Sequence, residues 1–296
     1  MNWNRFYVGL CGLLVSVSSL AQNNILNANT PDEIGAPSAA ELEYGKDEPL
    51  EYGYVDDRDI LWSKSTWEVI DLDERVNFPL YYPIDTNQIG GTRRSLYDVL
   101  VANIKNGKIP NIYADSYFND KRTLKDIGAA LSKVDTTDLG IEQYNAGEQI
   151  DPQFISRRDI SSADIMEYRI RGIWYFDKKQ AELKYRLLGI APVAPDVNFI
   201  DSEDPQLVEL FWVWFPSARE VLNENYAFNS ENTSQPISFD HLLNARRFNA
   251  VIYAEDNVQG DRQVNEYISN NAFMQLLESE RIKEQIRNFE QDMWNY

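Results

Sequence analysis

Cysteine is almost absent from the sequence. Cys11 is the single example, and it lies in an apolar stretch near the amino terminus. One thiol cannot form a disulfide within the chain. His241 is likewise the single histidine, whereas zinc sites are assembled from several histidine or cysteine ligands. The sequence therefore excludes a disulfide scaffold and a zinc centre built from these residue types.

Charge is scarce in the first 21 residues, which carry a single arginine. An apolar run from Phe6 to Val17 ends in Ser19-Leu20-Ala21, the small-x-small pattern that signal peptidase cleaves. The run is too short for a transmembrane helix. Residues 1–21 are therefore predicted to be a secretory signal peptide. A lipoprotein signal that acylates Cys11 is the alternative, but Val8-Gly9-Leu10 lacks the small residue that such a signal needs just before its cysteine.

Basic residues are few: 28 Lys and Arg stand against 47 Asp and Glu, for a formal net charge of −19. Nucleic-acid binding depends on clustered Lys and Arg that neutralise phosphates, so no nucleic-acid partner is expected. An anionic lipid surface would repel the chain, whereas a basic protein surface would attract it. No apolar run after residue 21 reaches the roughly 18 residues of a membrane helix. We expect an exported, soluble protein with no direct membrane span.

The usual catalytic motifs are missing as well. The sequence has no G-x-G-x-x-G, no Walker motif and no G-x-S-x-G nucleophile elbow to accompany His241. None of the acidic clusters has the spacing of an EF-hand calcium loop. We therefore expect no catalytic residue, no cofactor and no metal. A hydrolase that uses two carboxylates stays open as an alternative, because the fold sets the distance between such residues.

Periodicity defines several elements of a mixed fold. Residues 22–50 are rich in Asn, Ala, Pro and Glu and are predicted to be a flexible lead-in. Residues 95–104 have the spacing of an amphipathic helix, and residues 172–190 that of a β-hairpin. A long helix is predicted at the carboxyl end. One apolar stripe is expected along it, formed by Phe273, Leu276, Leu277, Ile286, Phe289 and Met293.

Two parts of the sequence echo each other. The segment "FPLYYP" (78–83) resembles "FWVWFP" (211–216), and each is followed by a capped helix pattern and then by Ile-Tyr-Ala and an acid. This shared order favours an internal duplication. The sequence thus predicts an α+β fold of two related units, each with an aromatic strand ending in proline, an amphipathic helix and a short strand. The units are expected at 51–135 and 161–296, with a loop or connector at 136–160.

The aromatic block at 211–216 has two interpretations. A continuous apolar run is typical of a strand that is buried on both faces of a sheet, which makes the block part of the core. Exposed rings at Trp174, Trp212 or Trp214 would instead form a glycan-binding platform. We favour the core strand, and burial of those rings would remove the glycan-binding alternative.

Paired arginines stand out in so acidic a chain. They form ion pairs with nearby acids, or they contact partner proteins, where arginine is enriched. We name them as candidate partner contacts, together with two aromatic residues at the carboxyl end: Arg93, Arg94, Arg157, Arg158, Arg246, Arg247, Trp294 and Tyr296.

Several long segments resemble one protein family. They include "PLEYGYVDDRDILWSKSTWEVIDLDERVNFPLYYP", "YRIRGIWYFDKKQAELKYRLLGIAPVAPD", "ELFWVWFPSAREVL" and the ending "QDMWNY". The likeness to the gliding-motility GldN family, called PorN in non-gliding relatives, extends from about Pro49 to Tyr296. It implies a periplasmic component of the type IX secretion system of Bacteroidota.

The resemblance also implies partners. Members of the family associate with a lipoprotein, GldK, in a ring beneath the outer membrane, where neighbouring copies lie side by side. The ring contacts the periplasmic part of GldM, which belongs to the proton-driven motor of the inner membrane. The family has no known catalytic residues, so none is carried over to this chain.

Overall fold

The computed structural model describes residues 48–85, 93–147, 149, 151–199, 205–229, 237–269 and 271–294, without the side chains of 135, 138 and 294. The predicted signal peptide and residues 22–47 of the lead-in lie outside these ranges. Residues from Pro49 onward form one compact unit. It contains both helices and antiparallel strands, so the predicted α+β class is confirmed.

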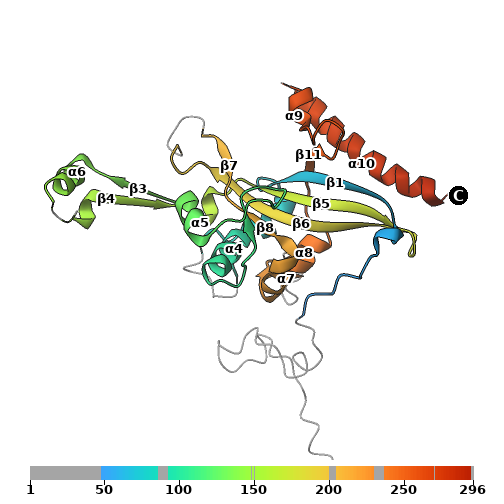
Figure 1. Cartoon of the computed structure of the whole chain (residues 1–296), viewed down its shortest axis with the longest axis horizontal. Helices are drawn as coiled ribbons and strands as arrows, with labels where there is room; N and C mark the ends of the chain where they lie inside the picture. The colour runs from blue at the N-terminus through green and yellow to red at the C-terminus, as the bar shows by residue number, and fades with distance from the viewer. Residues whose placement is uncertain are drawn as a thin grey trace, which may run out of the picture. The chain divides into compact units, whose positions relative to one another are not determined.

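A single antiparallel sheet organises the unit. Its centre is the hairpin of β5 (Glu167–Asp177) and β6 (Glu182–Pro195), which confirms the predicted hairpin. Strand β1 (Ile60–Asp71) pairs along the whole of β5. The strand order is β11-β1-β5-β6-β8-β2, and β7 (Leu207–Glu209) adds to the end of β6. Figure 1 shows β1, β5 and β6 side by side, with the blue β1 next to the yellow-green and yellow strands of the hairpin.

The sequence echo reappears as matched helices and strands. The first copy contains α3 (Phe78–Tyr81), α4 (Leu96–Lys105) and β2 (Ile112–Tyr113). The second contains α7 (Phe215–Glu224), α8 (Phe239–Asn244) and β11 (Val251–Glu255). The caps match too. The Ser95 hydroxyl accepts from the Asp98 amide, and the Ser238 hydroxyl accepts from the His241 amide, both at 3.2 Å.

The prediction of two aromatic strands that end in proline was wrong for the first copy and half right for the second. "FPLYYP" begins with the helix α3, and only Trp212–Trp214 of the second block forms a strand, β8. Pro79 and Pro216 both stand in the first turn of a helix. Proline is favoured there because its φ is already helical and the first helical N–H groups have no partner inside the helix.

Each copy completes its sheet with a strand from the other copy. Strand β2 of the first copy pairs with β8 of the second, and β11 of the second pairs with β1 of the first. The strand order is therefore symmetric. If it is read from the opposite edge and each strand is replaced by its counterpart in the other copy, the same order results. A boundary at residue 135 divides this shared sheet, so the two copies are related segments of one folded unit.

Helices cover the two faces unequally. The main core lies between the sheet and the helices α4, α7 and α8, and it includes Ile170, Leu100, Phe215 and Phe239. The other face carries α9 (Val264–Tyr267) and α10 (Ala272–Trp294), which pack through a smaller cluster around Ile282. In Figure 1, α7 and α8 lie below the sheet and α10 above it. None of the described helices is both long and apolar enough to cross a membrane.

A long segment with its own helices and strands follows the first copy. It begins with α5 (Leu124–Leu131), continues through β3 (Ser132–Thr136) and α6 (Asp138–Asn145), and returns along β4 (Ile155–Asp159). The interpretation of residues 136–160 as a loop was therefore wrong, since they contain a helix and a strand. Residues 132–159, which we call the arm, form a two-stranded sheet of their own.

The remaining elements are short. They are the 3-10 turns η2 (Asp57–Asp59), η3 (Arg75–Asn77), η4 (Pro152–Phe154) and η5 (Ser162–Asp164), and the strands β9 (Tyr226–Ala227) and β10 (Ile237–Ser238).

Candidate interaction surfaces

Helix α10 has two apolar faces rather than the single predicted stripe. Ile282 is fully buried and Ile286 nearly so, and Phe289 stacks on Trp62 of β1. Phe273 and Leu277 precede Ile282 and Ile286 by about two and a half turns, so they point to the opposite side of the helix. The predicted stripe wrongly placed them with Ile286. Phe273 is 67% exposed and Leu277 is 47% exposed.

The outward face of α10 is a compact apolar patch. We call it the helix surface, and it consists of Phe273, Met274, Leu276 and Leu277, all of them exposed. The start of the helix is held in place around it. The Tyr267 hydroxyl donates to Glu278 at 3.1 Å, and the Gln275 amide donates to the Ile268 carbonyl at 2.8 Å. The helix surface is therefore presented by an anchored segment.

The Tyr267–Glu278 contact affects both pKa values. Burial, and after it the negative charge of Glu278, raises the pKa of Tyr267 to about 12. Hydrogen bonds from Arg281 hold the pKa of Glu278 below its usual value. The contact is thus a polar link between α9 and α10 that depends on a protonated tyrosine and an ionised glutamate.

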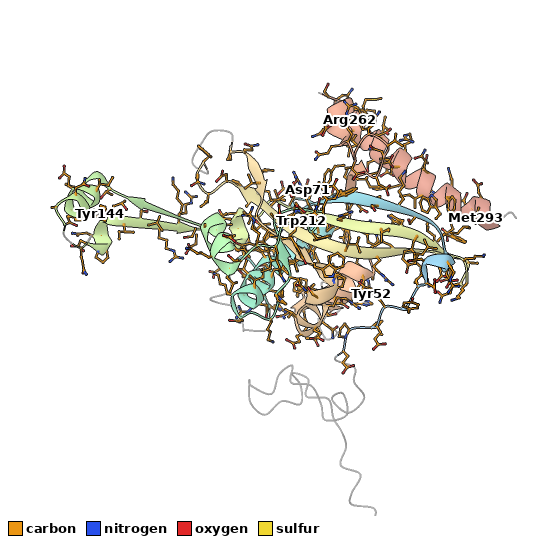
Figure 2. All side chains as sticks on the ribbon, in the orientation of Figure 1. Tyr52, Asp71, Tyr144, Trp212, Arg262 and Met293 are labelled. Atoms are coloured by element: carbon orange, nitrogen blue, oxygen red, sulfur yellow. The ribbon has the colours of Figure 1, made fainter. Side chains whose placement is uncertain are left out.

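The arm carries a second group of exposed apolar side chains. Of the arm residues whose exposure is described, Gly140 alone is buried. Tyr144, which Figure 2 labels at the tip of the arm, is 70% exposed. We call the following residues the arm surface: Val134, Ile141, Tyr144 and Ile155, all of them exposed. Leu139 is also exposed, but it lies on the opposite side of α6 from Ile141 and is not part of this surface.

Two of the predicted arginine pairs lie on separate elements. Arg157 and Arg158 are exposed on β4 of the arm, where Arg157 donates to Asp159 at 2.9 Å. The backbone of Arg93 forms an isolated β-bridge with that of Tyr226, and the Arg93 guanidinium lies 4.6 Å from the centre of the Phe228 ring. Arg94 is exposed beside it. The structure does not bring these arginines together into one site.

Arg246 forms a contact within the chain, while its neighbour Arg247 is exposed. Glu68 on β1 is fully buried, and Arg246 donates to it at 2.6 Å. The guanidinium of Arg246 also lies 4.1 Å from the centre of the Tyr185 ring. A role of these arginines in partner contacts stays a prediction. The same holds for Trp294, whose side chain is not described, and for Tyr296, which lies outside the described residues.

A second buried ion pair holds the start of the compact unit. Arg219 of α7 donates to both carboxylate oxygens of Asp240, at 2.8 and 3.0 Å. The ring of Tyr52 lies 4.0 Å below the Arg219 guanidinium, and its hydroxyl donates to Asn244 at 2.8 Å. Tyr52 (labelled in Figure 2) also contacts Arg186 and lines a shallow cavity of about 270 Å³. These contacts hold Tyr52, near the start of the compact unit, against α7 and α8.

The aromatic block does not provide a glycan platform. Trp212 is fully buried, and its indole N–H donates to Glu209 at 2.6 Å. Trp214 meets Phe118 edge-on, and Trp174 packs against Tyr185, so each is only partly exposed. Full burial of an aromatic side chain removes roughly 150–250 Å² from water, which is worth several kcal/mol. These rings stabilise the sheet, as the core interpretation predicted.

Within the described ranges, no group of three or more His, Cys, Asp or Glu side chains is arranged to hold a metal ion. His241 lies on the exposed side of α8, where its backbone N–H takes part in the Ser238 cap. Exposed apolar side chains gather on α10 and on the arm, and groups of this kind mark sites of protein contact when they are contiguous.

Comparison with known families identifies the class of protein. The family described as "Gliding motility associated protein GldN" matches residues 55–295, which include the sheet, the arm and α10. Proteins of this class take part in gliding motility and type IX secretion, and the class is not a known enzyme family. The chain belongs to the GldN family. A comparison with curated proteins found no match.

Proposed function

We propose that the chain is a non-enzymatic periplasmic subunit of the type IX secretion machinery, required for protein export across the outer membrane and for gliding. It assembles with copies of itself and with a GldK-like lipoprotein into a ring, and it contacts the periplasmic part of a GldM-like motor protein. The lipoprotein holds the assembly at the inner face of the outer membrane. The observation that carries this proposal is the family match over residues 55–295.

The sequence and the structure support the proposal in two ways. The amino-terminal segment has the pattern of an export signal. The described surface offers two exposed apolar groups, one on α10 and one on the arm, and such groups mark sites of protein contact when they are contiguous. A subunit of this kind acts through its contacts with neighbouring proteins.

Deletion of the gene tests the proposal. We expect loss of secretion for cargo proteins that carry type IX carboxyl-terminal signals, and restoration by the intact gene. A GldK-like lipoprotein should copurify with the chain from envelope extracts. Normal secretion in a strain with no second copy of the gene would refute the proposed function.

A further inference from the structure

The arm and helix α10 occupy equivalent positions in the two sequence copies. In the first copy, β2 is followed by a turn in which Tyr113 bridges Lys121, and α5 and the arm come next. In the second copy, β11 is followed by a turn in which Ala254 bridges Gln263, and α9 and α10 come next. Strands β2 and β11 are the opposite edges of the sheet. The two additions are therefore attached at opposite edges.

The arm lacks the packing that would make it stable in isolation. Its two strands pair only with each other among the described residues. An isolated two-stranded sheet is marginally stable in water and normally needs a third strand or a packed helix. Helix α6 follows β3 directly, yet Leu139 and Ile141 on it remain exposed. The arm surface would gain packing from a docking partner.

The helix surface also lacks a packing partner among the described residues. The opposite face of α10 is already occupied by the sheet through Ile282, Ile286 and Phe289. The sheet of the same chain therefore cannot also cover Phe273 and Leu277. The arm does not cover them either, because the arm surface and the helix surface are exposed in the same molecule.

The areas fit a pair of complementary surfaces. Side chains of this size expose on the order of 400 Å² on each surface when scaled by their exposed fractions. A specific protein interface buries about 1,200–2,000 Å² in total over both partners. When the two apolar surfaces dock on each other, they bury less than this by themselves. The polar residues around them supply the rest of the interface area.

We propose that the arm surface of one copy docks on the helix surface of a second copy of this chain, head to tail. This inference refines the self-association contained in the proposed function. Because the contact joins two different surfaces, a docked pair still offers the free helix surface of one copy and the free arm of the other, so the contact propagates into a ring or a filament.

Two variants of the full-length protein test the contact by sedimentation velocity. Tyr144→Asp places a charge on the arm surface, and Leu277→Asp places one on the helix surface. Both positions are exposed, so each variant should fold, which thermal unfolding checks. Val76→Asp, at an exposed apolar position outside both surfaces, is the matched control. The wild-type protein and the control should form oligomers that grow with concentration, and each of the two variants alone should associate at least tenfold more weakly.

The decisive sample is an equal mixture of the two variants. Tyr144→Asp keeps an intact helix surface, and Leu277→Asp keeps an intact arm. These two surfaces can form one contact, so the mixture should form dimers and no larger species. Dimers of Tyr144→Asp alone would indicate a helix-to-helix contact and overturn the proposal, as would dimers of Leu277→Asp alone, which would indicate an arm-to-arm contact. A wild-type protein that stays monomeric at all soluble concentrations also overturns it. The proposed function in export would survive each of these results, since secretion is measured separately.

Discussion

Phe289 in the last helix stacks on Trp62 in the first strand of the sheet, with ring centres 4.6 Å apart and planes 20° apart. Phe289 also meets Phe176 of β5 edge-on. These contacts connect the end of the chain to strands near its beginning and in its middle. Helix α10 is thereby fixed to the sheet by one face, and among the described residues the apolar side chains at the start of its other face stay exposed.

The two faces of α10 should respond differently to truncation. Ile282→Ala removes a fully buried side chain, and we expect it to lower the free energy of unfolding by about 2–4 kcal/mol. Leu277→Ala, on the exposed face, should change it by no more than about 0.5 kcal/mol. Equilibrium unfolding in urea measures both values. Equal losses for the two variants would contradict the orientation of the helix described above.

The buried Glu68–Arg246 pair gives a second prediction. Arg246→Met keeps an unbranched apolar stem but leaves the Glu68 carboxylate buried without its cation, so we expect a loss of about 3 kcal/mol in the free energy of unfolding. Arg247→Met, at the exposed neighbouring position, is the control and should have little effect. Adding Glu68→Leu to Arg246→Met should recover most of the lost stability, because the unpaired charge is gone. A fully stable Arg246→Met protein would show that the pair is not important for folding.

The exchange of strands predicts that neither sequence copy folds alone. A fragment of residues 51–135 lacks β5 and β11, the neighbours of β1, and β8, the neighbour of β2. We expect it to show no cooperative thermal unfolding and poor dispersion of amide signals in NMR spectra. Residues 49–296 should unfold in one transition. A stably folded fragment would mean that the copies are independent domains after all.

The contact between Tyr267 and Glu278 makes the stability of the protein sensitive to alkaline pH. Tyr267 has a pKa of about 12 in the folded chain, above its ordinary value of 10. Its contribution to stability is therefore complete below pH 10 and is lost as the pH rises from 10 to 12. Tyr267→Phe should remove this part of the pH dependence, which urea unfolding at pH 9 and 11 would reveal.

A titration of the same tyrosine distinguishes the causes of its raised pKa. Glu278→Gln removes the negative charge next to the hydroxyl, so the pKa of Tyr267 should fall part of the way towards 10, and burial should account for the rest. NMR of ¹³C-labelled tyrosine rings follows the titration, and Tyr267→Phe assigns the signal. An unchanged pKa in Glu278→Gln would rule out the carboxylate as a cause.

Local patterns in the sequence predicted much of the fold. The Ser95 cap and the 3,4 spacing after it specify α4, and the polar turn between two apolar arms specifies the β5–β6 hairpin. The pairing of β2 with β8 could not be predicted, because strand pairing depends on contacts far apart in the sequence. The continuous apolar residues of "FPLYYP" predict a strand, and that prediction is wrong. The correct signal was the proline in the second position of the segment, which is typical of a helix start.

The interaction surfaces were less accessible to sequence reasoning. In the sequence, the exposed apolar residues of α10 cannot be told from core residues, because the face of the helix that packs on the sheet is not known. The angular positions of Phe273 and Ile282 could have separated the two faces, since a half-integral number of turns lies between them. The arm was hidden by its polar composition, which resembles that of a loop. Paired arginines are conspicuous in an acidic chain, yet Arg246 forms an ion pair inside the fold.

Crosslinking in the native cell envelope is the most direct test of head-to-tail assembly. A chain carrying both Tyr144→Cys and Phe273→Cys, whose natural cysteine lies in the predicted signal peptide, is treated with a short bis-maleimide and separated by denaturing electrophoresis. The account predicts a ladder of dimers, trimers and higher species that is absent from either single-cysteine chain. A double-cysteine chain that yields monomers alone, or dimers and nothing larger, would contradict it.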